Sequence, residues 1–285
     1  MEKWTEIYRE DQLKALQRAE LEVLDELNRL CEKLGLAYFV YGGTLIGAVK
    51  YRGFVPWDDD VDVAMPRADY EKLLREGPGA LSPDYFLQSP KTDPKSPYAY
   101  AKLRRRNTAC VEYGVHRLPM EHGIYVDIYP IDRVPSEEAA FRKNHKRFHT
   151  LARLYFYRQC PYLTRRGTGL AVRLRQGALY LVSAGLRLIP RGLLVRRMDA
   201  AARRCGEENA RYGNYFHAEP VNVFRRLEPY ETGSFEGRTV RLPGDWDGFL
   251  RARYGDYSKL PPEDKRIGHK PYLLDLGDAA RTDET

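Results

Sequence analysis

The sequence predicts an α/β (α+β) fold, with a mixed-sheet core in residues 1–135 and a helical second half. Three observations predict it. Apolar residues recur at three- and four-residue steps over residues 13–34, which is the period of an amphipathic helix. Short apolar runs bounded by glycine or proline follow, as is typical of buried strands. Over residues 136–212 the helical period returns.

Each expected element of the first half is bounded by a residue that suits its end. The N-terminal helix should stop at Gly35, because glycine adopts the left-handed conformation that closes many helices. The elements expected next are a strand over 37–41 ended by Gly42-Gly43, a strand over 61–65 ended by Pro66, a helix over 67–75, a proline-rich loop over 78–97, strands over 98–104 and 108–113, and a strand over 124–129 ended by Pro130.

The second half is expected to be a series of helices broken at Pro161 and Pro190. The chain then divides into three parts. Residues 1–135 form the core, residues 136–215 form a helical, arginine-rich insert, and residues 216–285 complete the core domain.

The composition is that of a folded protein. Of 285 residues, 43% are hydrophobic and 31% are charged, which excludes disordered, collagen-like and coiled-coil chains. Apolar runs near the N-terminus are too short for a signal peptide or a spanning helix. The four cysteines form no CxxC pair, so we expect reduced thiols and a cytoplasmic location.

Positive charge is concentrated in one segment. Between Pro161 and Cys205 there are ten arginines and one acid, Asp199, so this segment has a net charge of +9. The net charge of the whole chain is +7, and the residues outside the segment therefore sum to −2. A uniformly basic nucleic-acid binder would differ, and we expect no nucleic-acid partner.

Within that segment, residues 178–189 are apolar except for Ser183 and Arg187. Twelve residues are too few to cross a bilayer, which needs about 20. Arginines lie on both sides of the stretch, at Arg173, Arg175, Arg191, Arg196 and Arg197. The pattern predicts a helix that rests on an anionic membrane at its inner face. The alternative is an apolar stretch packed on the core, with arginines that face solvent or bind an anionic polymer.

The densest chemical feature is the acidic run Trp57-Asp58-Asp59-Asp60-Val61-Asp62-Val63. Clustered carboxylates repel one another, so folding stability does not explain them. On a strand, Asp60 and Asp62 would project from the same face, roughly 6–7 Å apart at the backbone. Such a pair can share Mg²⁺ or Mn²⁺ together with substrate phosphates. The alternative is a solvated acidic turn.

A third carboxylate, Asp127, lies inside an apolar strand, where it could complete the cluster or be a hydrogen-bonded buried acid. Upstream, Gly42-Gly43-Thr44 follows a strand directly, where backbone can approach phosphate oxygens closely. Gly42 and Gly47 have P-loop spacing, but Ala48-Val49 replaces the required Lys-Ser/Thr, so a Walker A site is rejected.

Four stretches together resemble the LicD family, which includes fukutin-related proteins. They are residues 38–70 (YFVYGGTLIGAVKYRGFVPWDDDVDVAMPRADY), 98–108 (YAYAKLRRRNT), 123–132 (GIYVDIYPID) and 253–266 (RYGDYSKLPPEDKR). The resemblance implies a nucleotidyltransferase-like fold and transfer of a substituted phosphate from a CDP-activated donor to a glycan hydroxyl. In similar bacterial members the donor is usually CDP-choline and the acceptor a teichoic acid or surface oligosaccharide such as lipopolysaccharide.

The resemblance also implies roles by position. Gly43 and Thr44 match the glycine turn, Asp60 and Asp62 the metal-binding pair, Asp127 the third carboxylate, and Lys102 and Arg104 a basic pair assigned to donor phosphates. For that basic pair the alternative is a solvated basic strand. Of Asp58 and Asp59, at least one is expected to support a turn or its neighbours.

We therefore predict that the chain is a metal-dependent phosphotransferase. One rival is a glycosyltransferase that uses D-x-D to hold a nucleotide sugar, which would release a nucleoside diphosphate where a CDP-choline phosphotransferase releases CMP. A second rival is a non-enzymatic nucleic-acid binder that uses the arginines.

Overall fold

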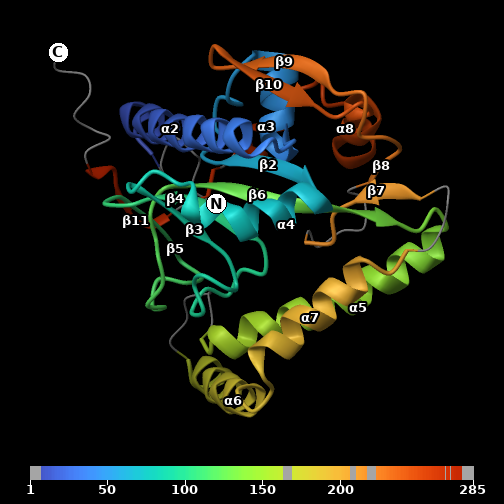
Figure 1. Ribbon diagram of the computed structural model, residues 1–285. Helices are drawn as coiled ribbons and strands as arrows, with labels where there is room; N and C mark the ends of the chain where they lie inside the picture. The colour runs from blue at the N-terminus through green and yellow to red at the C-terminus, as the bar shows by residue number, and fades with distance from the viewer. Residues whose placement is uncertain are drawn as a thin grey trace.

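A seven-stranded mixed sheet forms the centre of the protein (Figure 1). The computed structural model describes residues 8–162, 169–205, 210–216, 223–266, 268–269 and 271–277. Across the sheet the strands are β1 (Phe39–Val40), β2 (Val61–Pro66), β6 (Tyr125–Val134), β4 (Ala101–Arg105) and β3 (Tyr85–Gln88). Strand β7 (Arg211–Gly213) pairs with the far end of β6, and β8 (Val223–Phe224) pairs with β7.

The pairing of the central strands aligns polar residues from separate stretches of sequence. Strands β2 and β6 run parallel, whereas β4 is antiparallel to β6 and to β3. The register places Asp62 beside Asp127, Asp127 beside Lys102, and Lys102 beside Gln88. Paired residues at one register project from the same face of a sheet, so the fold gathers these four side chains.

The predicted N-terminal helix is α2 (Glu10–Leu34), and it ends at Gly35 with φ 61°, as expected. Its apolar stripe, which includes Leu16 and Leu27, is fully buried and packs over β4 and β6. The predicted helix after Pro66 is α4 (Arg67–Glu76), followed by the 3₁₀ turn η2 (Gly77–Gly79).

Three expectations about local structure were wrong. The glycine turn is the start of a helix, α3 (Gly42–Ile46), which continues as the π-helix η1 (Gly47–Tyr51). The proline-rich loop contains strand β3, because its four residues pair with β4. Strand β6 runs through Pro130, which lies opposite Met65 of β2 and between the stretches of β6 that pair with β4 and with β7.

The helical half has a core of its own. Helices α5 (Glu138–Gln159) and α7 (Arg191–Ala202) pack together around buried Phe141, Phe148 and Met198. Helix α6 (Leu170–Leu186) packs against α5, and the three helices form a separate group in Figure 1. No single helix in the described ranges is long and apolar enough to cross a membrane; α6 and α7 reach that length only as a pair bent by 87°.

The C-terminal part returns to the core. Hairpin β9 (Glu231–Phe235) and β10 (Arg238–Leu242) lies against β1 and η1, with α8 (Trp246–Tyr254) beside it. After η3 (Glu263–Lys265), strand β11 (Pro271–Asp275) pairs with β5 (Ala109–Glu112). This pairing brings residues 268–269 next to the acidic run. The three-part division at residues 135 and 215 stays a prediction.

Candidate active site

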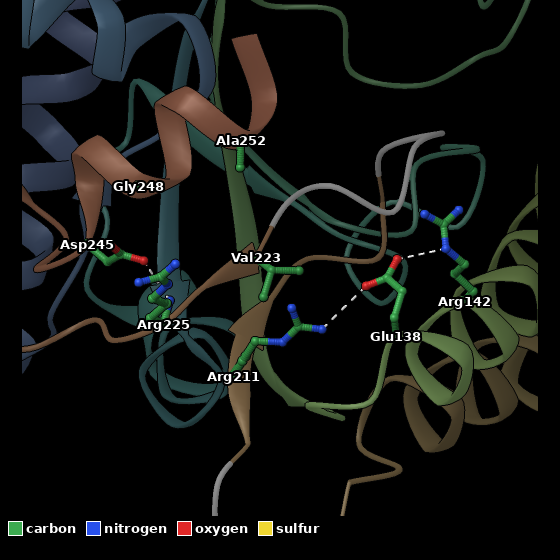
Figure 2. Close-up of a pocket in the computed structure, with 8 residues that line it drawn as sticks. All are labelled: Glu138, Arg142, Arg211, Val223, Arg225, Asp245, Gly248 and Ala252. Carbon is green, nitrogen blue, oxygen red and sulfur yellow. Dashed lines mark hydrogen bonds and ion pairs between the residues drawn. The ribbon is translucent and has the colours of Figure 1, made fainter. Parts of the chain in front are cut away.

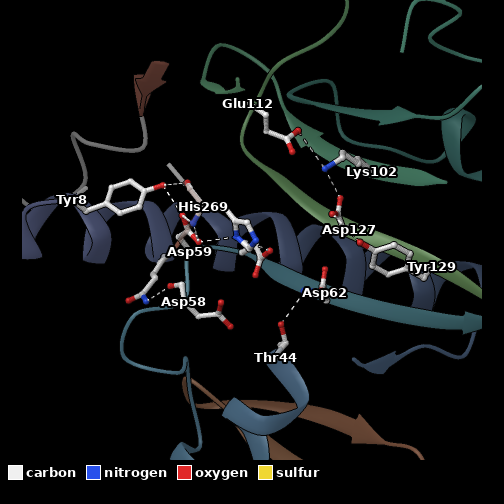
Figure 3. Close-up of polar contacts among 12 residues, drawn as sticks. Tyr8, Thr44, Asp58, Asp59, Asp62, Lys102, Glu112, Asp127, Tyr129 and His269 are labelled. Carbon is white, nitrogen blue, oxygen red and sulfur yellow. Dashed lines mark hydrogen bonds and ion pairs between the residues drawn. The ribbon is translucent and has the colours of Figure 1, made fainter. Parts of the chain in front are cut away.

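Asp127 is held by a buried lysine. The Nζ of Lys102 lies 2.8 Å from Asp127 Oδ1 and 3.7 Å from a carboxylate oxygen of Glu112 (Figure 3). Both Lys102 and Asp127 are buried, with the Lys102 side chain only 1% exposed. The ammonium is therefore already paired with carboxylates of β5 and β6.

Tyrosines surround this ion pair. The Lys102 ammonium lies 3.6 Å from the ring centroid of Tyr125 and 4.5 Å from that of Tyr98, within cation–π range. The Tyr129 hydroxyl donates to Asp127 Oδ2 at 3.3 Å. The tyrosine rings exclude water from Lys102, so its pairing with Asp127 is stronger than a surface ion pair.

Helix α3 fixes the position of Asp62. The Asp62 backbone N–H donates to the hydroxyl of buried Thr44 at 2.9 Å. A Cβ on Gly42 would lie 2.7 Å from Asp62 Oδ2, and a Cβ on Gly43 would lie 2.5 Å from Asp58 Oδ2. Both glycines are therefore needed because carboxylates lie directly against the helix start. The positive end of the helix dipole favours that arrangement.

Asp59 differs from the neighbouring aspartates in its hydrogen bonds, which join distant parts of the chain. Its carboxylate accepts from the Tyr8 hydroxyl at 2.7 Å and from the His269 backbone N–H at 2.8 Å. The His269 Nδ1 lies 3.1 Å from Asp59 Oδ1 and 3.5 Å from Asp60 Oδ2. Asp59 thus joins the start of α2 to the C-terminal segment, and it brings an imidazole to the edge of the acidic group.

The surroundings of the other aspartates of this group raise their pKa values and so disfavour the ionised forms. Burial, reinforced by the neighbouring acids, raises the pKa of Asp58 and Asp62 well above the usual range. Burial raises the pKa of Asp60 to about 6, against the charge of His269. The pKa of Asp127 is also raised by burial, while Lys102 opposes the shift. The site therefore has an excess of buried negative charge that a cation would relieve.

His269 is the matching cation. Its hydrogen bond with Asp59, together with the charges of Asp60 and Asp59, raises its pKa to about 10, so the imidazole is protonated at neutral pH. Its side chain is 73% exposed, unlike those of the acids it contacts. A charged, accessible imidazole beside buried carboxylates can contact an anionic substrate.

The donor set fits a hard divalent cation. Asp62 Oδ1 is buried and has no hydrogen-bond partner among the residues that the structure describes. No three His, Cys, Asp or Glu side chains among the described residues already form a group that could hold a metal ion. A carboxylate oxygen without a hydrogen-bond partner is a ligand that Mg²⁺ accepts, together with water and substrate phosphates.

The sheet and α3 therefore bring together most of the predicted site. Asp62, Asp127 and Lys102 lie in register, Gly43 and Thr44 lie in α3, and Asp60 immediately precedes β2. The chemical roles of these residues stay predictions.

Arg104 lies two residues beyond Lys102 on β4, and both side chains lie over the Tyr125 ring. The Arg104 guanidinium donates to Gln88 Oε1 at 2.8 Å and to the Gly123 carbonyl at 2.7 Å, and it is fully buried. The alternative of a solvated basic strand was wrong for both Lys102 and Arg104, because β4 is a central strand with β3 and β6 on either side.

The elements that form this group of residues lie in a stretch of the chain that is similar to known proteins. Residues 35–156, which include α3, β2, β4 and β6 in full, match the family described as LicD/FKTN/FKRP, nucleotidyltransferase domain. Residues 35–156 are therefore similar to a LicD-family nucleotidyltransferase domain. The resemblance found in the sequence motifs is thereby confirmed.

Relatives extend the similarity beyond that domain. The lipopolysaccharide cholinephosphotransferase LicD of Haemophilus influenzae is 27% identical over 266 residues, which cover 89% of this chain and 95% of that protein. An uncharacterized protein of Rickettsia typhi is 36% identical over 62 residues, covering 22% of this chain and 19% of its own length. The first of these aligns over the helical half as well as the LicD-family domain.

Sequence reasoning missed four residues of this site. Tyr8, Glu20, Glu112 and His269 surround the predicted acids, and Glu20 is a buried carboxyl on α2 whose Oε2 has no hydrogen-bond partner. Burial, together with Asp60 and Asp59, raises the pKa of Glu20 well above its usual range. The available signals were weak: an acid on the apolar stripe of α2, and a histidine three residues beyond the last LicD-like stretch.

A cavity of about 310 Å³ lies elsewhere, between α5, β7 and α8 (Figure 2). Its charged side chains are largely paired, since Glu138 contacts Arg142 at 2.7 Å and Arg211 at 3.6 Å. None of the acids of the LicD-family site lines it. We therefore place the candidate active site at the acidic group and not in this cavity.

Proposed function

We propose that this chain is a metal-dependent phosphotransferase that moves phosphocholine from CDP-choline to a hydroxyl of a cell-surface glycan, either lipopolysaccharide or a teichoic acid precursor. The observation that carries the proposal is the register of Asp62 beside Asp127 on parallel strands, within a LicD-family nucleotidyltransferase domain. The similarity to a lipopolysaccharide cholinephosphotransferase over 89% of the chain supports the choice of group and acceptor.

Asp60 and Asp62 would hold the Mg²⁺ or Mn²⁺ ion, and Asp127 would contribute from the adjacent strand. When bound, the ion supplies charge neutralisation for the donor pyrophosphate. The buried Oδ1 of Asp62 supports this assignment, because it accepts no hydrogen bond from the described residues.

The transfer conserves atoms and charge. The acceptor oxygen forms a bond to the choline-bearing phosphorus, the bond from that phosphorus to the bridging oxygen of the pyrophosphate breaks, and CMP leaves. Asp127 would accept the hydroxyl proton. The Lys102 ammonium keeps Asp127 ionised despite burial, which lets it act as a base.

Cationic and backbone groups would orient the donor. His269 is charged and exposed, so it can contact a phosphate oxygen. Gly43 and Thr44, in the first turn of α3, would contact a donor phosphate through their backbone N–H groups. The family resemblance assigned Lys102 and Arg104 to donor phosphates. We infer instead that they act indirectly, by holding Asp127 and the strands that flank it in place.

The test is to incubate the full chain with Mg²⁺, CDP-choline and lipopolysaccharide lacking phosphocholine, with teichoic acid in parallel, and to measure CMP. Release of CMP that requires the acceptor and stops on addition of EDTA supports the proposal. Asp84→Asn serves as the control, because Asp84 is exposed and lies outside the site. A nucleotide-sugar panel that yields nucleoside diphosphates instead would support the glycosyltransferase rival.

A further inference from the structure

Helix α6 has two apolar faces, and within the described part of the chain only one of them packs against another element. The packed face recurs at Val172, Gln176, Leu179, Ser183 and Leu186 and lies toward α5. The opposite face carries Leu170, Leu174 and Leu181, at steps of four and seven residues, which are 73%, 67% and 77% exposed. An amphipathic helix on a globular protein would be polar on this outer face.

The exposed leucines continue beyond the helix. Leu188, at the bend between α6 and α7, is 86% exposed, and Val182 and Tyr180 are about half exposed. Together with Leu170, Leu174 and Leu181 these residues form what we call the α6 outer face. Figure 1 shows α6 at the far end of the helical group from the sheet.

The surroundings of the α6 outer face are cationic. Arg173 and Arg175 lie on either side of the leucine stripe, and Arg187 follows the helix, all of them exposed. The one acid between residues 169 and 205, Asp199, already contacts Arg67 and Arg203. An occupant of this face must therefore be apolar where it meets the leucines and anionic where it meets the arginines.

We propose that the α6 outer face docks on the surface of an anionic lipid bilayer, with its leucines in the acyl boundary and its arginines at the headgroups. A second copy of the chain fits less well, because it would bring two arginine clusters together. An anionic polymer would satisfy the arginines but leave the leucines in water. The helix lies on the membrane and does not cross it, since its packed face stays on α5.

The experiment is flotation of the full chain with vesicles of phosphatidylcholine, with and without a third of phosphatidylglycerol, at low and high salt. We expect the protein to float with the anionic vesicles at low salt only. Leu174→Gln/Leu181→Gln should reduce the bound fraction by at least about tenfold, because both side chains leave the acyl boundary. Arg173→Gln/Arg175→Gln should reduce it as well.

Matched controls lie elsewhere on the surface. Leu260→Gln removes a 52% exposed leucine, and Lys33→Gln/Arg226→Gln removes two exposed charges. Both should float like the unmodified chain, and circular dichroism should show that all variants fold. The proposal is overturned if the unmodified chain stays at the bottom at low salt, or if the leucine variant floats normally. It is also overturned if sedimentation without lipid shows a dimer that the leucine variant abolishes.

Discussion

At the residue scale, Asp60 and Asp62 occupy positions that cost folding free energy, because burial and neighbouring acids raise their pKa values. We expect Asp60→Asn and Asp62→Asn each to lower transfer by on the order of 10³-fold, since each removes a charged ligand. Without metal, each should raise the melting temperature. Calorimetry beside the CMP assay measures both effects. Full activity in either variant, or a variant that unfolds, would contradict these roles.

The pKa of Asp60 gives a pH dependence with a definite sign. Its value in the folded protein, about 6, is above that of an unfolded Asp. Below the unfolded value both states are protonated, and as pH rises toward 6 the unfolded state loses its proton first. Stability relative to Asp60→Asn should therefore fall by about 2–3 kcal/mol between pH 4 and pH 7 in EDTA. Urea unfolding at several pH values measures it; a flat difference would contradict the burial of charge.

Lys102 gives a third prediction, because its ammonium pairs with Asp127 in a site without water. Lys102→Met should cost about 3–5 kcal/mol, since it leaves a buried carboxylate unpaired. Adding Asp127→Asn should recover much of that loss, as urea unfolding of the two single variants and the double variant would measure. Additive losses would show that the pair does not interact. A solvated basic strand, the alternative for this pair, would predict almost no loss of stability.

At the element scale, α3 and β2 form one unit, because Thr44 holds the backbone of Asp62 and the two glycines leave room for carboxylates. Gly42→Ala should lower activity by at least about tenfold and stability by about 1–3 kcal/mol, since Gly42 has φ 57° and a Cβ would lie 2.7 Å from Asp62 Oδ2. Gly79→Ala, where a Cβ meets nothing within 4 Å, is the control. Equal behaviour of the two variants would contradict this role of α3.

Sequence patterns predicted elements whose signal is local. The apolar stripe of α2, its Gly35 end and the valines that flank Asp62 were enough to place these elements and the acidic strand face. The register that joins Asp62, Asp127 and Lys102 could not be predicted, because strand pairing depends on contacts distant in sequence. Strand β3 was missed because proline-rich flanks masked four residues, and His269 was missed because only the β11–β5 pairing brings it to the acids.

At the scale of the whole molecule, the sheet-containing core and the helical group differ in their charge and in their exposed apolar surface. The core holds a buried acidic group, while the helical group holds a second apolar core and the cationic α6 outer face. If α6 rests on an anionic membrane, the catalytic core is held near any acceptor that is built on a lipid carrier. Membrane docking and phosphotransfer are nevertheless separable, because the variants that test them lie in the helical group and in the core, respectively.

In the proposed reaction, the phosphorus that bears choline is transferred from CDP-choline to the acceptor glycan. The most direct measurement uses CDP-choline labelled with ³²P at that phosphorus, incubated with Mg²⁺, the full chain and acceptor glycan. We expect the label to appear in the glycan and the released CMP to be unlabelled, with no transfer by Asp62→Asn. Label that remains in a nucleoside diphosphate while the glycan stays unlabelled would contradict it.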